Sequence, residues 1–350
     1  MSRVFFSVLF LFVFLPYSFS QAGNAPKKPS AIFGEDIVKP RMRVIIDNDF
    51  GGDPDGLFQL VHHLLSPSVE IRAIIGSHLR AGDPFDPSKE QAVHAKKKIE
   101  EVLGTMNLSK AYPVYQGSNV ALTDKSTPHR SEAAEAIVKE AMRDDTKQPL
   151  YVVCGAGLTE IASAYLIEPA IAKRLTLIWI GGPEYVELAP PPPGYTSLEY
   201  NLGIDIIAGQ VIFNKSEIPI WQIPRNVYRQ MIYPYSSLLV KVKTQGKIGN
   251  YLTTTLEELM RRIGKFNYYL GEVYILGDSP LVLLTALQSS FEADPSSSDY
   301  VLHSSPLIND QGLYEVNHSG RNIRVYQRVD AALVFEDFIS KLVLFHERNK

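Results

Sequence analysis

Cysteine is almost absent from this sequence: Cys154 is the only one among 350 residues. A single cysteine cannot form an intramolecular disulfide, so the fold must hold together without one. Cys154 follows the apolar run 150–153, where a small side chain is typical of a protein core. We therefore expect a buried structural residue at this position rather than a nucleophile.

The sequence also lacks an excess of basic residues. It has 35 Lys and Arg against 38 Asp and Glu, which gives a formal net charge of −3 at pH 7. Domains that bind nucleic acid usually carry a basic patch or stripe, and none is visible here. Nucleic acid is therefore not an expected partner.

Long apolar runs are missing except for one near the start, at residues 4–15. This run is shorter than the 20 or so residues that a membrane-spanning helix needs. It follows Arg3 and precedes Ser18 and Ser20, so it has the basic head, apolar middle and small residues of a signal peptide cut after Ser20. We expect residues 1–20 to be removed, residues 21–40 to form a tether, and the protein to be secreted or periplasmic with no stable membrane anchor. A retained anchor is the alternative.

Residues 41–350 have the pattern of a single α/β domain. Short runs rich in β-branched residues alternate with segments of helical period, as in a mostly parallel sheet flanked by helices, open and doubly wound. The expected strands are 43–47, 69–75, 150–154, 175–180 and 218–222. The expected helices are 57–65, 88–103, 131–143, 158–166, 206–214, 236–247, 252–263, 280–288 and 334–345. In such sheets, ligands bind at the carboxyl ends of the strands.

Four carboxylates stand at the end of the first expected strand, at Asp47, Asp49, Asp53 and Asp55. Like charges crowded into a partly dry site repel one another, so they need a cation or shared protons. Carboxylate oxygens are the ligands that hard cations prefer. The cluster therefore predicts one half of a metal site.

The chain resembles the nucleoside hydrolase family of N-ribosyl hydrolases, as a divergent, secreted, inosine-uridine-type member. Residues 47–55 are similar to the Asp-x-Asp-x-Gly-x-Asp-Asp motif that opens the family's domain. Further matches follow in the family's order: 113–117 (Pro-Val-Tyr-Gln-Gly), 157–162 (Gly-Leu-Thr-Glu-Ile-Ala), 179–182 (Trp-Ile-Gly-Gly), 199–201 (Glu-Tyr-Asn) and 277–280 (Gly-Asp-Ser-Pro). The resemblance runs from about residue 43 to the end of the chain.

The resemblance implies a Ca²⁺ site and a catalytic base. The matching positions give Asp49, Asp55 and Asp278 as metal carboxylates and the backbone carbonyl of Thr159 as a neutral ligand. Asp53 is the alternative to Asp55, because Pro54 separates two aspartates that are adjacent in the family. Asp49 would also be the general base that activates water.

The same resemblance implies the substrate and its contacts. Family members hydrolyse the N-glycosidic bond of purine or pyrimidine ribonucleosides to ribose and free base, and usually form homodimers or homotetramers. Glu199 and Asn201 would bind the ribose hydroxyls, and Asp53 would lie on the 2-hydroxyl side. Apart from the resemblance, we expect the leaving base to be contacted by stacking on Trp179, Tyr185 or Tyr228, or by His78 at a strand end.

The chemistry explains this grouping of acids. Hydrolysis of an N-glycosidic bond passes through a ribosyl cation, which carboxylates stabilise, and it needs an activated water. Ca²⁺ takes about six to eight oxygen ligands, enough for a water and a vicinal diol beside the protein's own oxygens.

One departure from the family affects the leaving group. Where some members have a histidine before the last metal aspartate, this chain has Gly277, which cannot donate a proton.

Two other functions fit part of the pattern. Asp47 and Asp49 after a strand also suit a phosphatase of the haloacid dehalogenase type, but no late acidic pair completes that site. A secreted protein that binds Ca²⁺ and a nucleoside or sugar without hydrolysis is the second alternative, and Gly277 supports it.

Overall fold

The computed structural model describes residues 33, 37–289 and 297–350. The predicted signal peptide, 1–20, lies outside these residues, as does most of the predicted tether, 21–40. Within the described part, no helix has both the length and the apolar character needed to cross a membrane.

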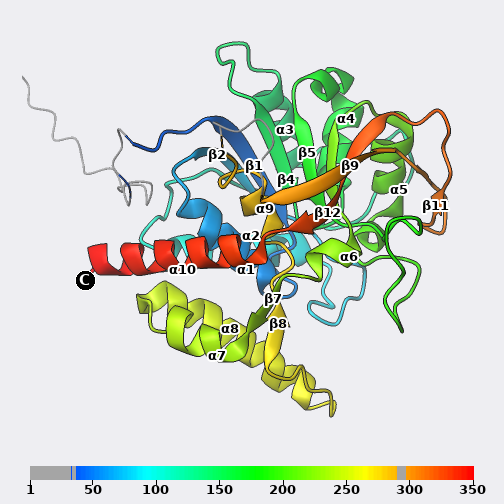
Figure 1. The fold of residues 1–350 in the computed structure, drawn as a ribbon. Coiled ribbons are helices and arrows are strands. Elements are labelled where there is room, and N and C mark those ends of the chain that lie inside the picture. The colour runs from blue at the N-terminus through cyan, green and yellow to red at the C-terminus, as the bar shows by residue number, and fades with distance from the viewer. Residues whose placement is uncertain (1–32, 34–36, 290–296) are drawn as a thin grey trace, which may run out of the picture.

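The main sheet, taken over the described residues, has eight strands in the order β3-β2-β1-β4-β5-β6-β12-β9 (Figure 1). All neighbours pair in parallel except β12 and β9, which are antiparallel. The predicted mostly parallel sheet is therefore confirmed. The strands are β1 Met42–Asn48, β2 Val69–Gly76, β3 Val114–Gln116, β4 Leu150–Cys154, β5 Thr176–Ile180, β6 Ile220–Ile223, β9 Ser298–Ser304 and β12 Asn322–Val329.

The direction of strand order reverses beside β1. The chain passes from β1 outward through β2 to β3, then returns to place β4 on the other side of β1. Ligands in open α/β sheets bind at such a reversal, outside the carboxyl ends of the two strands. A ligand is therefore expected beside the residues just after Asn48 and Cys154.

Helices cover both faces of the sheet, because each buried strand sends alternate side chains to opposite sides. On β1, Val44 and Ile46 join one apolar cluster and Ile45 joins the other. The first cluster includes α1 Asp55–Leu64, α2 Gln91–Thr105, α8 Gly246–Gly264, α9 Pro280–Leu283 and α10 Ala331–Arg348. The second includes α3 Glu132–Ala141, α4 Thr159–Ile167, α5 Ile206–Gln210 and the π-helical turn Val211–Lys215.

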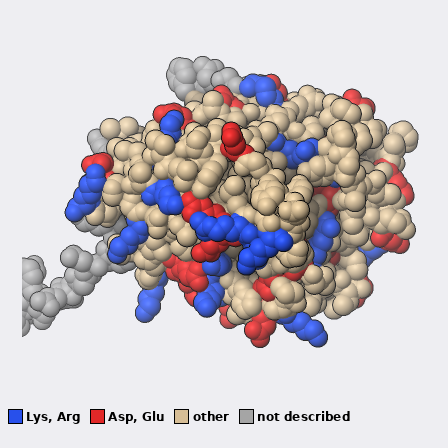
Figure 2. All heavy atoms as spheres, turned by 90° about the horizontal axis from the view of Figure 1, so that it is seen from below, with Lys and Arg blue, Asp and Glu red and all other residues tan. Residues whose placement is uncertain are grey.

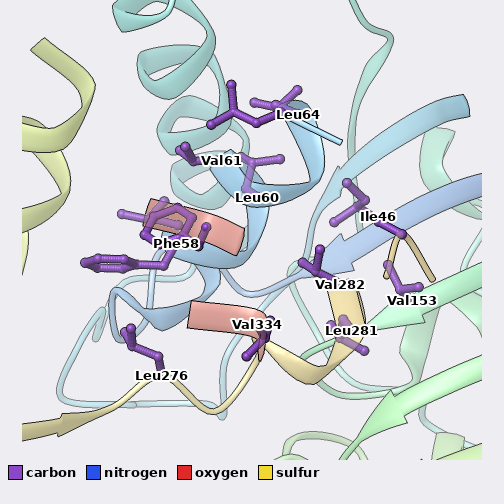
Figure 3. Packing of buried hydrophobic residues seen from close by; sticks show 14 of the residues in the cluster. Ile46, Phe58, Leu60, Val61, Leu64, Val153, Leu276, Leu281, Val282 and Val334 are labelled. Atoms are coloured by element: carbon purple, nitrogen blue, oxygen red, sulfur yellow. The ribbon is translucent and has the colours of Figure 1, made fainter. Parts of the chain in front are cut away.

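α10 packs against both α1 and α9. Phe338 on α10 lies 5.9 Å from Phe58 on α1, measured between ring centroids. His62 Nε2 is 2.6 Å from Asp337 Oδ2, and Lys341 Nζ donates to Ser66 Oγ at 2.9 Å. Figure 3 shows side chains of all three helices in one apolar cluster. The C-terminal helix therefore supports the two helices that begin next to the candidate site.

Several elements differ from the sequence prediction. The predicted helix 236–247 is broken into α7 Tyr235–Ser237 and a π-helical turn, Leu238–Val242, and α8 then starts at Gly246, whose φ is +64°. Only the first part of the predicted helix 280–288 is a regular helix, because α9 ends at Leu283. Strands β9 and β12 were not predicted, because polar side chains interrupt their apolar pattern.

A short antiparallel pair, β7 Ile232–Pro234 with β8 Val273–Ile275, was also not predicted. With α7 and α8 it extends below the main sheet in Figure 1. Figure 2, which looks at the molecule from that side, shows acidic and basic side chains interspersed rather than one continuous basic area.

Candidate active site

The turn between β1 and α1 holds three of the predicted site residues. Asp49 N donates to the side-chain Oδ1 of Asn48 at 2.9 Å, and Gly52 N donates to Asp49 O at 2.7 Å. Asp55 N donates to Asp53 Oδ1 at 3.0 Å as α1 begins. This folded turn, rather than an extended loop, sets the directions of the carboxylates.

Asp278 joins these residues from a distant part of the chain. It lies just before α9 and is 3% exposed. Asn48 Nδ2 donates to Asp278 Oδ2 at 2.8 Å, across 230 positions of sequence. A Cβ added at Gly155, just after β4, would lie only 2.7 Å from Asp278 Oδ1. The carboxyl ends of β1 and β4 and the start of α9 therefore meet.

These residues line a cavity of about 200 Å³. The lining contains no Lys, Arg or His. It consists of Asp49, Asp53, Asp55, Leu79, Phe85, Gly155, Ile180, Glu199, Tyr200, Asn201, Tyr228, Gly277 and Asp278. A larger cavity of about 720 Å³, over residues 121–126 and α5, includes none of the predicted site residues, so size alone does not identify the site.

Three acids of the cavity, Asp49, Asp55 and Asp278, have raised pKa values. Loss of solvation raises the pKa of Asp49 and of Asp55 well above the usual value, and the negative charge of Asp278 raises both further. Burial raises the pKa of Asp278 to about 7, although the hydrogen bond from Asn48 opposes the change. Crowded carboxylates with no basic residue in the lining require a cation or bound protons.

The donor set fits a hard cation by its chemistry. Carboxylate oxygens converge on the cavity from two segments, and glycines at positions 56, 155 and 277 leave room beside them: a Cβ at any of the three would come within 3.3 Å of a carboxylate oxygen. Across residues 33, 37–289 and 297–350, however, no three His, Cys, Asp or Glu side chains are already close enough together to form a metal site. The carboxylates would have to move together around an ion.

Glu199 and Asn201 also line the cavity, and both side chains are held by hydrogen bonds. Glu199 Oε2 accepts from the backbone N–H groups of Gly182 at 2.8 Å and Leu202 at 2.9 Å, and Oε1 accepts from the Tyr228 hydroxyl at 2.9 Å. Asn201 Nδ2 donates to two backbone carbonyls, which fixes its amide. Both side chains are thus oriented before any ligand arrives.

Three predicted site residues lie outside the cavity lining. Thr159 is the first residue of α4, and its hydroxyl donates to Asp205 Oδ2 at 2.7 Å. His78 Nε2 is 2.9 Å from that hydroxyl, and burial lowers the pKa of His78. Trp179 is fully buried and donates from Nε1 to Ala156 O at 2.9 Å. The backbone that does line the cavity after β4 is Gly155, four residues before Thr159.

The sequence prediction did not include Leu79, Phe85 and Gly155 in the site. All three follow the carboxyl ends of β2 or β4, the two strands that flank β1. That shared position was the available signal, because the carboxyl ends of neighbouring parallel strands meet at one edge of the sheet.

Comparison with known proteins identifies a family and a fold. The family model described as "Inosine-uridine preferring nucleoside hydrolase" matches residues 44–336. A solved inosine-guanosine nucleoside hydrolase is 18% identical, with a TM-score of 0.63 over 88% of this chain and 99% of its own. A purine-preferring ribonucleoside hydrolase from Gardnerella vaginalis is 18% identical, with a TM-score of 0.65 over 87% and 99%.

A more distant structural match is the type III effector protein XopQ, solved in complex with adenosine diphosphate ribose. It is 13% identical, with a TM-score of 0.54 over 91% of this chain and 95% of its own. No curated protein matches the sequence significantly. At these identities, the structural matches establish a shared fold.

Proposed function

Because the chain belongs to the inosine-uridine preferring nucleoside hydrolase family, whose members are metal-dependent hydrolases of N-glycosyl bonds, we propose that it cleaves ribonucleosides to ribose and free base with the help of Ca²⁺. The observation that carries this proposal is one cavity lined by Asp49, Asp55, Asp278, Glu199 and Asn201, with no basic residue in its lining. Membership of a hydrolase family favours this function over the phosphatase and the non-catalytic binder considered above.

Asp49, Asp55 and Asp278 would hold the ion, with Asp53 as the alternative to Asp55. The resemblance implied the backbone carbonyl of Thr159 as a neutral ligand. In the structure, Gly155 rather than Thr159 lines the cavity. When bound, the ion supplies positive charge that binds a vicinal diol and lowers the pKa of water.

The chain's own residues account for the other requirements of the reaction. Asp49, as a carboxylate in the cavity lining, takes the proton from the attacking water. Glu199, fixed by two backbone N–H groups, accepts a hydrogen bond from a ribose hydroxyl. The carboxylates together stabilise the ribosyl cation as the C1′–N bond breaks.

A panel of ribonucleosides tests this function directly. The protein is incubated with each nucleoside in Ca²⁺ or in EDTA, and released base and ribose are measured. We expect base release in Ca²⁺, its loss in EDTA, and much faster cleavage of inosine than of 2′-deoxyinosine, which lacks the diol. The Asp49→Ala variant should be inactive, whereas Asp144→Ala, whose side chain is 82% exposed, should not change the rate.

Each part of the proposal has its own contrary result. Undiminished activity in EDTA would exclude the ion, and equal rates with inosine and 2′-deoxyinosine would exclude recognition of the diol. No release of base from any ribonucleoside would overturn the proposed substrate class.

We also propose that the protein is exported, on the basis of the sequence of residues 1–20. Expression of the full chain should yield an extracellular or periplasmic product that begins at Gln21, which N-terminal mass analysis would detect. A product that retains Met1 and sediments with membranes would support the anchor instead.

Gel filtration with light scattering would decide between the homodimer and the homotetramer expected from the family.

A further inference from the structure

A second cavity adjoins the candidate active site. The first cavity, at about 200 Å³, is smaller than the 300 to 1,000 Å³ or so typical of a complete small-molecule site. The second has a volume of about 350 Å³ and shares Asp53, Asp55, Tyr228 and Gly277 with the first. The two together fall within the usual range, so a substrate with two parts would occupy both.

The walls of the second cavity suit a flat, polar ring. Three tyrosines, at positions 195, 228 and 274, line it together with Arg229 and the apolar residues Leu270, Val273 and Ile275. Aromatic walls accept a planar heterocycle by stacking. The carboxylates that the two cavities share mark the boundary between the sugar side and this aromatic side.

Arg229 is the only cationic residue in the lining of either cavity. Its guanidinium lies 4.3 Å from the centroid of the Tyr195 ring. Its Nε is buried and has no hydrogen-bond partner. The nearby carboxylate of Glu184 is already bound by both Nε and Nη2 of Arg225, at 2.8 and 2.6 Å. Within the described part of the chain, Arg229 therefore has no ion-pair partner and keeps hydrogen-bonding capacity for a ligand.

The Tyr228 and Tyr274 hydroxyls in the second cavity are already hydrogen-bonded. The Tyr228 hydroxyl donates to Glu199, and the Tyr274 hydroxyl is hydrogen-bonded to Asp53. Gly277 offers no side chain, and a Cβ there would lie 3.3 Å from Asp55 Oδ2 and 3.4 Å from a carbon of the Tyr228 ring. A proton donor on Gly277 is therefore both absent and sterically disfavoured.

We propose that the second cavity receives the nucleobase and that Arg229 stabilises the negative charge that the base acquires as it leaves. This inference rests on the proposed ribonucleoside hydrolysis and adds to it the group that assists the leaving base. A guanidinium keeps its charge at any working pH and presents several donors to ring oxygens or nitrogens.

The reaction balances without a protein acid for the base. The C1′–N bond breaks and its electron pair goes to the base, while the oxygen of water bonds to C1′ and its proton goes to Asp49. The base departs as an anion held by Arg229 and takes its proton from bulk water. The cation thus replaces a proton donor, in the manner of other fixed charges that stabilise a developing anion.

The test compares two leaving groups. Inosine releases a poor leaving group, whereas p-nitrophenyl β-D-riboside releases a phenolate whose charge is delocalised without help. In Arg229→Met, kcat for inosine should fall about 10- to 100-fold, as expected when a charged hydrogen bond to the transition state is lost. The kcat for p-nitrophenyl riboside should change less than about 3-fold, because the charge of its leaving group needs no cation for stabilisation. Arg229→Lys, which keeps the charge, should recover part of the inosine activity.

Arg324 provides the matched control, since its guanidinium also lies 4.3 Å from an aromatic ring, that of Trp221, but lines neither cavity. Arg324→Met should leave both substrates unaffected. If the wild-type protein cleaves both substrates, and Arg229→Met either loses activity equally on both or keeps full activity on both, the role of Arg229 is refuted while the proposed function stands. If the wild-type protein cleaves neither, the proposed function fails, and the inference with it.

Discussion

Replacement of Asp278 by asparagine should stabilise the metal-free protein while removing its activity. The asparagine side chain would keep the size of the aspartate and an oxygen for the hydrogen bond from Asn48, but it would remove one of the crowded charges. Because the pKa of Asp278 is raised to about 7, the folded protein binds a proton there that the unfolded chain has already lost above pH 4 or so. Wild-type stability therefore falls as pH rises from about 4 to 7.

The size of this effect follows from the raised pKa. The difference from an ordinary aspartate, about three pH units, corresponds to about 4 kcal/mol above pH 7. For a domain of this length, that is a rise in Tm of about 6 °C. The exposed Asp144, which pairs with Arg174 at the surface, provides the control, and Asp144→Asn should change Tm little.

Thermal unfolding at pH 8, in EDTA and then in excess Ca²⁺, is the assay. In EDTA, Asp278→Asn should melt above the wild type. In Ca²⁺ at about 100 times its Kd, the wild type should gain about 2.7 kcal/mol that the variant does not, so the gap should shrink. A variant that melts below the wild type in EDTA would contradict the claim that charge repulsion destabilises the metal-free site. A gap that Ca²⁺ leaves unchanged would show that no ion binds at this residue.

Three further changes test other parts of the structure. Gly155→Ala should lower kcat/KM for inosine at least tenfold, because its Cβ would lie 2.5 Å from Asn48 Nδ2 and 2.7 Å from Asp278 Oδ1 and would displace both side chains. The same overpacking should cost about 1 to 3 kcal/mol of stability, and a normal rate would contradict the proposed site. Glu184→Gln should lower the free energy of unfolding by about 3 to 5 kcal/mol, because it leaves the buried charge of Arg225 without a partner charge. Urea unfolding measures this change, and a loss of less than about 1 kcal/mol would contradict the expectation. Burial lowers the pKa of His62 to about 4, so on acidification the unfolded chain binds a proton at this histidine before the folded protein does. The free energy of unfolding should therefore fall as pH drops from about 6.5 to 4. Urea unfolding at several pH values should show a smaller fall in His62→Gln.

The candidate acids could be predicted from the sequence by two different routes. Asp49 follows a strand of the expected parallel sheet, whereas Asp278 was predicted only from the resemblance of residues 277–280 to a family motif, because the strand before it, β8, belongs to a separate antiparallel pair. The structure brings both into the lining of one cavity. Which backbone group faces that cavity could not be read in the same way. Thr159 and Gly155 are four residues apart, and only the actual end of β4 and start of α4 decide which of them lines the site.

Trp179 shows a second limit of the sequence. Its place at the end of a strand suggested contact with a base, yet alternate residues of a strand face opposite sides of the sheet, and this side chain packs against Phe213 in the core. The second cavity was unpredictable for a different reason. Its wall comes from β8, a strand of three residues, Val273–Ile275, whose pairing with β7 has no strong local signal.

The position of α10 gives the protein a vulnerability remote from its chemistry. This helix braces α1, which starts at Asp55, and α9, which starts two residues after Asp278. A protease that removed α10 would loosen both helices at once and abolish activity, although every residue that lines the candidate active site would still be present.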